Sequence, residues 1–155
     1  MILTPAVNLI EDFRKNGKQK PLRMMIDAST PTGLIDPYDV GIVAAHLLAQ
    51  EKTVLHNQRR YVFNGPEDVT GERIVKLVEQ HVSEAVNDVR FKDLSMIDQM
   101  VDDTNESKNV IGSIKLAPTT SWAGQAKAKT TSKEILELYG PKRTASEVLK
   151  KLLKA

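Results

Sequence analysis

The stretch Gly33-Leu34-Ile35-Asp36-Pro37-Tyr38-Asp39-Val40-Gly41-Ile42-Val43-Ala44-Ala45-His46-Leu47-Leu48 decides how this chain folds. Asp36 followed by Pro37 predicts the start of a helix, because a carboxylate caps backbone N–H groups and proline fits the first helical position. Asp39 adds a favourable charge in the first turn. The apolar residues that follow recur at helical spacing: Val40, Val43, Ala44, Leu47 and Leu48. Because small or apolar residues also fill the other faces, we expect a helix buried between layers on both sides.

Composition places the chain among soluble, single-domain proteins. It has 155 residues, 41% hydrophobic and 27% charged, with no cysteine, which excludes disulfides and thiolate metal sites. No apolar run approaches the ~20 residues of a membrane span, and the first residues lack the basic start of a secretory signal. We therefore expect a cytoplasmic protein without a membrane partner.

Positive charge gathers in the last part of the chain. Residues 127–155 hold eight basic and three acidic side chains, although the whole chain is only +2. A basic segment can contact nucleic acid, but no aromatic residues are interleaved to stack on bases. We expect a solvated helix face and no nucleic-acid partner.

Periodicity and capping residues predict a helix-rich α/β chain with three or four short strands. Strands are expected at residues 22–26, 33–35, 59–64 and 89–92, and residues 1–3 resemble the end of another. Helices are expected at residues 4–16 and 110–116 and after Asp36, Thr70, Ser95, Ser132 and Thr144. Residues 118–131 are expected to be mostly irregular, with Trp122 anchoring them to a groove.

Two details of this pattern concern how the elements begin and pair. Thr144 with Glu147 predicts a capping box, and Ser95 with Asp98 resembles one with Asp in place of Glu. Strands separated by helices favour parallel pairing through βαβ crossovers. Three or four short strands are too few to cover both faces of the apolar helix after Asp36. We therefore expect its second layer to come from sequence outside this chain.

Motifs for catalysis and cofactor binding are absent from the sequence. The eight glycines are dispersed and form neither GxGxxG nor a P-loop. The three tyrosines are followed four residues later by Ile42, Gly65 and Arg143, so no Tyr-x-x-x-Lys pair occurs. The histidines lack metal-ligand spacing, and the serines lack a GxSxG elbow. The residues themselves therefore predict no catalytic group and no metal site.

Several segments, in order and spacing, resemble the NmrA-like family, atypical extended relatives of the short-chain dehydrogenases. Residues 33–45 resemble its "fIDprDvGevAA" segment, and residues 61–70 its "y.ltGpe.lT" strand, turn and helix cap. Residues 89–95 match the strand after the next helix. Residues 141–144 resemble its "pkrT" segment, and residues 3–11 its "lrPg.f.eNl" segment, which leaves the sixth strand of a Rossmann sheet.

The resemblance implies that residues 1–155 form a single partial domain, the substrate-side, C-terminal half of a Rossmann-type NAD(P)-binding fold. Family members bind NADP or NAD; some are oxidoreductases acting on small substrates, and others are redox sensors without catalysis. By resemblance, Thr4, Pro5 and Ala6 lie near the nicotinamide end of the cofactor. Asn8, Leu9 and Asp12 line the substrate cleft. This chain lacks the N-terminal glycine-rich βαβ unit, so we expect a truncated form without catalytic residues that binds no cofactor by itself.

Two other interpretations remain open. The chain is alternatively a protein-binding module, which pairs through an exposed apolar face with another copy or with a partner chain that supplies the missing half. An intact small enzyme is the third, and it requires a catalytic group that the sequence does not reveal.

Overall fold

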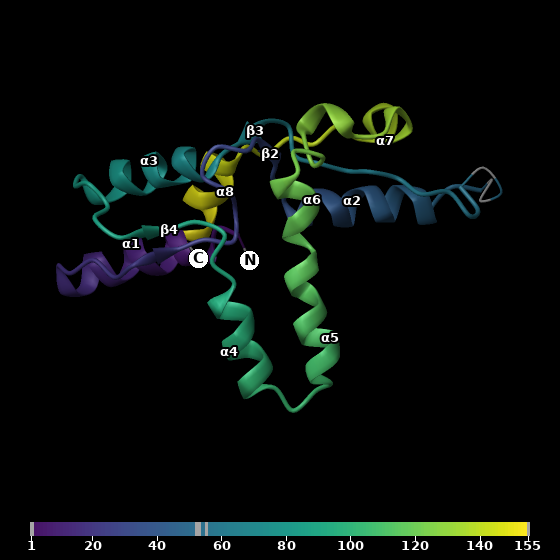
Figure 1. Cartoon of the computed structure of the whole chain (residues 1–155). Coiled ribbons are helices and arrows are strands. Elements are labelled where there is room, and N and C mark those ends of the chain that lie inside the picture. The colour runs from purple at the N-terminus through teal and green to yellow at the C-terminus, as the bar shows by residue number, and fades with distance from the viewer. Residues whose placement is uncertain (1, 52–53, 55, 155) are drawn as a thin grey trace.

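The computed structural model describes residues 2–51, 54 and 56–154 and shows a helix-rich chain with four short strands in that part. The helices are α1 (Thr4–Asn16), α2 (Pro37–Leu48), α3 (Gly71–Val82), α4 (Ser95–Asp103), α5 (Lys108–Ser113), α6 (Pro118–Trp122), α7 (Lys133–Leu138) and α8 (Ala145–Leu152). Two 3-10 turns, η2 (Ile114–Leu116) and η3 (Ala128–Thr130), join them. The strands are β1 (Leu22–Arg23), β2 (Thr32–Gly33), β3 (Asp68–Val69) and β4 (Val89–Arg90). Figure 1 shows a body with two extensions, an arm of α2 with α7 and a hairpin of α4 to α6.

The strands form two separate pairs. β1 and β4 are parallel, with Leu22 opposite Val89, as the sequence predicts for strands joined through helices. β2 and β3 are antiparallel, so the expectation of parallel pairing is wrong for them. The predicted strand at 59–64 is absent. Its Val62 and Asn64 amides donate to the Ser132 and Thr131 hydroxyls, and the Val62 carbonyl oxygen accepts the Ser132 amide, so no strand pairs with it. Residues 2 and 3 are not in a strand, and residue 1 lies outside the described residues.

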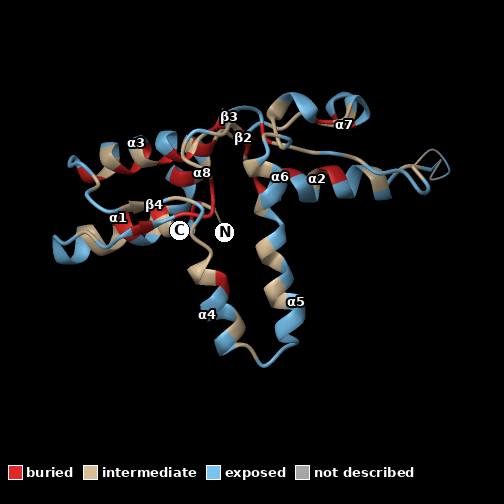
Figure 2. Cartoon of the chain, viewed as in Figure 1, coloured by how far each residue is buried: buried red, intermediate tan, exposed pale blue. Residues whose placement is uncertain are grey.

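The core lies in the body, where α1 and α3 pack together around β1 with α8 beside them (Figure 2). Each of these elements contributes fully buried side chains, and so does Met24 directly after β1; they include Ile10, Leu22, Met24, Ile74, Val78 and Leu149. Burying one such side chain contributes roughly 1.5–3 kcal/mol. The apolar faces of the amphipathic helices α1, α3 and α8 are therefore buried by other residues of this chain.

Helix α2 differs from the prediction of burial on both sides. Asp36 caps it as expected, accepting a hydrogen bond from the Tyr38 amide at 2.9 Å. Only Asp39 and Val43 are buried, and Leu48 is 84% exposed. Besides Tyr38 and His46, the exposed residues of α2 are apolar or small: Pro37, Val40, Gly41, Ala44, Ala45 and Leu48. The apolar side chains of α2 predict that it packs against other elements on several faces. The two-stranded sheets of this chain are too small to bury those faces.

The total accessible surface area is larger than that of a compact protein of this mass. The chain exposes 9878 Å² at 17.2 kDa. A compact monomer of that mass exposes about 7,800 Å², so the surplus is roughly a quarter.

In the part of the chain that the structure describes, no helix is long and apolar enough to span a membrane.

The segment 118–131 is more ordered than the sequence indicates. It contains α6 and η3, and α6 continues the line of α5 and η2 to form one side of the hairpin (Figure 1). The Trp122 indole N–H donates to the Met25 carbonyl oxygen at 2.8 Å, which attaches this segment to the end of β1. The Lys92 ammonium lies 5.6 Å from the Trp122 ring and 2.6 Å from the Asp27 carboxylate. This contact with Lys92, followed by the Thr30 and Ser29 amides, holds the pKa of Asp27 well below its usual value.

The two predicted capping boxes have different outcomes. At α8 the box is present, because Thr144 and Glu147 exchange side-chain-to-backbone hydrogen bonds. At α4 it is absent, and the prediction for Ser95 with Asp98 is wrong. The Asp93 carboxylate, two residues upstream of Ser95, instead accepts the Ser95 amide at 2.8 Å and so satisfies one N–H group in the first turn of α4.

Candidate functional site

A cleft of about 350 Å³ lies between α1, β1 and the start of α4. Five of the six residues that the family resemblance selects line it together: Thr4, Pro5, Asn8, Leu9 and Asp12. The sixth, Ala6, is completely buried in the core and does not line the cleft.

The geometry of α1 explains this grouping. Thr4, Asn8 and Asp12 are four residues apart, so they lie on one face of the helix, one above the other. Leu9 is buried, whereas Thr4 and Asn8 are exposed. A proline in the first turn and Gly17 in the left-handed conformation define the two ends of the helix. The face therefore presents polar groups above an apolar base.

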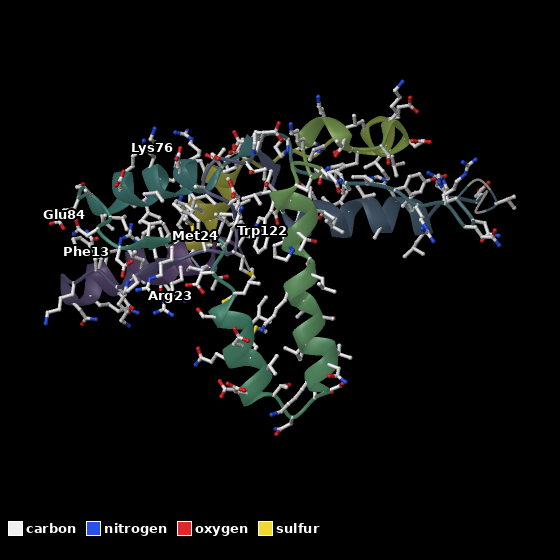
Figure 3. The ribbon with its side chains drawn as sticks, in the orientation of Figure 1. Phe13, Arg23, Met24, Lys76, Glu84 and Trp122 are labelled. Carbon is white, nitrogen blue, oxygen red and sulfur yellow. The ribbon has the colours of Figure 1, made fainter. Side chains whose placement is uncertain are left out.

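Charged residues that the sequence analysis did not select form the opposite wall. Because successive side chains of a strand point to opposite faces, Met24 lies in the core and Arg23 lines the cleft (Figure 3). The Arg23 guanidinium donates to the Ser95 hydroxyl at 3.3 Å and lies 3.9 Å from the Asp93 carboxylate. Lys20 pairs with Asp12 at 2.6 Å. The sequence predicts parallel pairing of its strands only in general; the pairing of β1 with β4 in particular would have placed Arg23 near Asp93.

The Asp93 carboxylate is held in its ionised form. Hydrogen bonds from the Ser95 side chain and backbone lower the pKa of Asp93, against the opposing effect of burial, and Arg23 lowers it further. Both carboxylates of the cleft thus already have donors, since Asp12 pairs with Lys20. The arrangement is suited to binding and orienting a polar molecule.

Apolar residues close the cleft and extend it. Ile2, Met25 and Met96 are among its lining residues. A second, almost wholly apolar pocket of about 140 Å³ shares Ile2 and Met25 with the cleft and continues to α6 at Pro118. The two pockets adjoin, so together they offer a polar and an apolar compartment.

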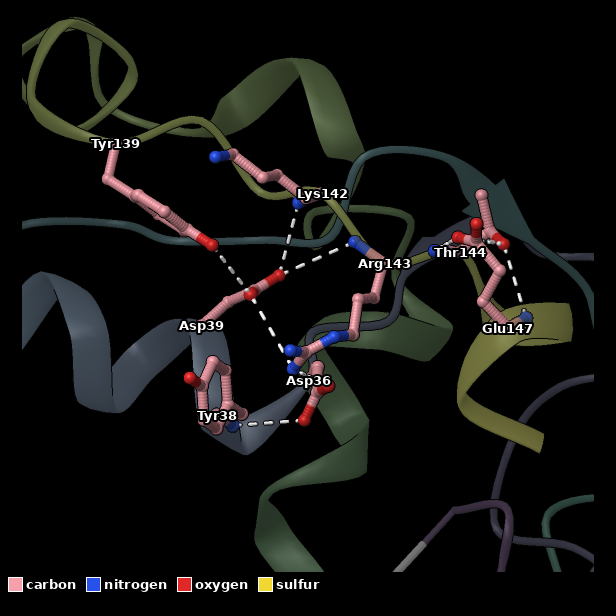
Figure 4. A network of polar contacts seen from close by, with 8 residues as sticks. All are labelled: Asp36, Tyr38, Asp39, Tyr139, Lys142, Arg143, Thr144 and Glu147. Atoms are coloured by element: carbon pink, nitrogen blue, oxygen red, sulfur yellow. Dashed lines mark hydrogen bonds and ion pairs between the residues drawn. The ribbon is translucent and has the colours of Figure 1, made fainter. Parts of the chain in front are cut away.

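A separate polar network fastens α2 to the segment before α8 (Figure 4). Asp39 is 1% exposed and accepts hydrogen bonds from the Tyr139 hydroxyl and the Lys142 amide, both at 3.1 Å. Arg143 pairs with Asp36 at 2.7 Å and lies 3.9 Å from Asp39. Burial, then the hydrogen bond to Asp39, raises the pKa of Tyr139. Both carboxylates are occupied, so this network holds the fold together and offers no free acid or base.

A third candidate lies beside α7, in a pocket of about 400 Å³. There the two ring nitrogens of His56 contact the Tyr61 hydroxyl at 2.7 Å and the Gln50 side-chain oxygen at 2.6 Å. Because both nitrogens are taken, His56 has no free position for a substrate. Among the described residues, no group of three or more His, Asp or Glu side chains is placed to hold a metal ion.

Comparisons with known proteins add no relative. Scans against protein-family models, curated proteins and solved structures found no match to this chain. The resemblance to the NmrA-like family therefore stays a prediction from the sequence.

Proposed function

We propose that this chain is the substrate-side half of an NmrA-like, Rossmann-type NAD(P)-binding protein, of the oxidoreductase or redox-sensor type. The observation that carries the proposal is the cleft of α1. Residues selected only by their place in the family segment, among them Thr4, Asn8 and Asp12, line one cavity with an apolar floor. Ligand sites are concave and combine apolar surface with polar groups that orient the ligand, and this cleft has both, with the polar and charged residues in the majority.

The dinucleotide itself is proposed to lie on a different part of the complete fold. A pyrophosphate site needs a glycine-rich turn at a helix N-terminus, and the glycines of this sequence are dispersed. The outward face of α2 supports the same arrangement, because small residues such as Gly41 and Ala44 permit close packing under a sheet. Alone, the chain is proposed to bind neither NADP nor NAD and to catalyse no reaction.

A fluorescence titration with NADPH tests this assignment. The chain by itself should show no micromolar binding, whereas a fusion behind the glycine-rich half of an NmrA-like protein should bind NADPH. In the fusion, Thr4→Trp should weaken NADPH binding, because Thr4 is proposed to lie at the nicotinamide end. Micromolar binding by the chain alone, or a fusion that folds without binding NADPH, contradicts the proposal.

The exposed face of α2 favours a second candidate function, that of a protein-binding module. Val40 and Leu48 are exposed among small residues of α2, and an exposed apolar face of this kind is typical of a protein-binding surface. Sedimentation velocity and an apolar dye separate the two candidates. Self-association that Leu48→Glu abolishes supports the module, and a folded monomer that binds no dye refutes it.

A further inference from the structure

The charges of the α1 cleft are unequally neutralised. Lys20 is paired with Asp12 at 2.6 Å. Asp93 receives the Ser95 amide at 2.8 Å at the start of α4, where the helix dipole also favours a negative charge. Arg23, the fourth charged group of the cleft, has the longest ion pair, 3.9 Å to Asp93, and is therefore the least closely neutralised.

Arg23 keeps donors available for a ligand. In the part of the chain that the structure describes, its guanidinium makes one hydrogen bond, to the Ser95 hydroxyl at 3.3 Å. The Asp93 carboxylate lies 3.9 Å from its Nε, beyond hydrogen-bond distance. The side chain is 48% exposed and lines the cleft. A guanidinium has five N–H donors in a planar fork that matches a carboxylate with two parallel hydrogen bonds.

The remaining walls suit an apolar body next to that anion. Pro5, Leu9 and Met25 line the cleft, and Met25 is shared with the apolar pocket that reaches α6. Methionine side chains adapt to ligands of different shape, and Met96 adds a second one at the start of α4. The polar and apolar compartments thus lie side by side.

We infer that the cleft binds a small amphipathic carboxylate, with its carboxylate on Arg23 and its apolar part on Leu9 and Met25. The inference rests on the proposed function and names the class of its substrate. Arg23 acts as the specificity-determining group, because its ion pair with Asp93 is longer, at 3.9 Å, than the 2.6 Å pair of Lys20 with Asp12 and leaves most of its N–H donors for a ligand.

The test compares cinnamate with its neutral isostere cinnamide in an amide chemical-shift titration of the whole chain. Cinnamate should bind at least tenfold more tightly than cinnamide and shift the amide signals of Asn8, Leu9 and Met25. Equal affinities, or no binding of either compound, overturn the inference.

Two arginine variants locate the effect. Arg23→Gln should lower the affinity for cinnamate at least tenfold, to that for cinnamide, because it removes the carboxylate partner. Arg90→Gln is the matched control: Arg90 is the register partner of Arg23 on β4 but does not line the cleft, so the affinity should stay within twofold. Equal losses in both variants show a general charge effect and overturn the inference. Because NADPH takes no part, a negative result here leaves the fusion test of the proposed function standing.

Discussion

Helices α2 and α3 have twelve residues each and differ sharply in how this chain covers them (Figure 2). Helix α3 alternates charged and apolar residues at helical spacing and buries an apolar stripe, including Ile74 and Val78. Helix α2 is apolar on nearly every face, yet it buries only Asp39 and Val43. An amphipathic pattern therefore predicts where a helix is covered by its own chain. A uniformly apolar pattern predicts that a helix is buried, but it does not predict whether the same chain or another chain buries it.

The largest expected effect comes from truncating the core of α3. Ile74→Ala should lower the free energy of unfolding by about 3 kcal/mol, because it leaves a cavity beside fully buried neighbours. Leu48→Ala on α2 is the control and should change it by less than about 0.5 kcal/mol, since Leu48 is exposed. Urea unfolding measures both. A large loss of unfolding free energy for Leu48→Ala would show that the outward face of α2 is buried in solution. It would contradict the conclusion that this chain buries α3 but not α2.

The attachment of α2 is polar, so removing its buried charge is expected to have the next largest effect. Asp39→Asn should destabilise the chain by about 2 kcal/mol, because donors from Tyr139 and Lys142 lose a charged acceptor. Asp98→Asn is the control, since Asp98 pairs with Lys115 at the surface, and an exposed pair contributes about 0–1 kcal/mol. Equal thermal shifts for both variants would mean that α2 is held by its apolar contacts instead.

Much of the fold could be predicted because its signals are local. Asp36, Thr70 and Thr144 cap their helices as expected, and the stripe of α3 is buried as its period predicts. What failed depends on distant partners. Residues 59–64 were predicted as a strand from their side chains, but Thr131 and Ser132 bond their backbone instead.

The candidate site divides in the same way. Helical spacing places Thr4, Asn8 and Asp12 on one face of α1, so their grouping follows from sequence. Arg23 and Asp93 are 70 residues apart and meet only because β1 pairs with β4, which a single sequence indicates weakly. No local signal shows that the ion pair of Arg23 is the longer of the two in the cleft.

Two glycines sharpen the comparison of the helices further. Gly71→Ala at the start of α3 should cost about 1–2 kcal/mol, because an added Cβ lies 2.7 Å from the Asp27 carbonyl oxygen and 2.6 Å from the Phe91 ring. Gly41→Ala in α2 should stabilise the isolated chain by about 0.5–1 kcal/mol, since open space surrounds that position and alanine favours a helix. Thermal unfolding of both variants shows whether each substitution raises or lowers the stability of the chain. Destabilisation by Gly41→Ala would mean that another chain already packs against α2.

The smallest expected effect distinguishes the caps of the two helices by pH. Helix α3 is capped by the Thr70 hydroxyl, which does not titrate, and α2 by the Asp36 carboxylate. Burial raises the pKa of Asp36, but the hydrogen bonds from the Tyr38 amide and from Arg143 outweigh it, so the pKa lies below its usual value of 3.8.

A carboxylate whose pKa is lowered in the folded state contributes stability above its unfolded pKa of about 3.9 and loses it as the pH falls through the folded value. Asp36→Asn keeps a capping side chain but cannot titrate, so it should cost about 1 kcal/mol or less at pH 7 and show a smaller loss of stability below pH 4. Urea unfolding at pH 7 and pH 3 measures the difference. Thr70→Asn is the control, because it changes the cap of α3 without adding or removing a titratable group. If both variants lose stability in acid as steeply as the unchanged chain, Asp36 does not carry the acid sensitivity of α2, and its network with Arg143 matters for geometry rather than for charge.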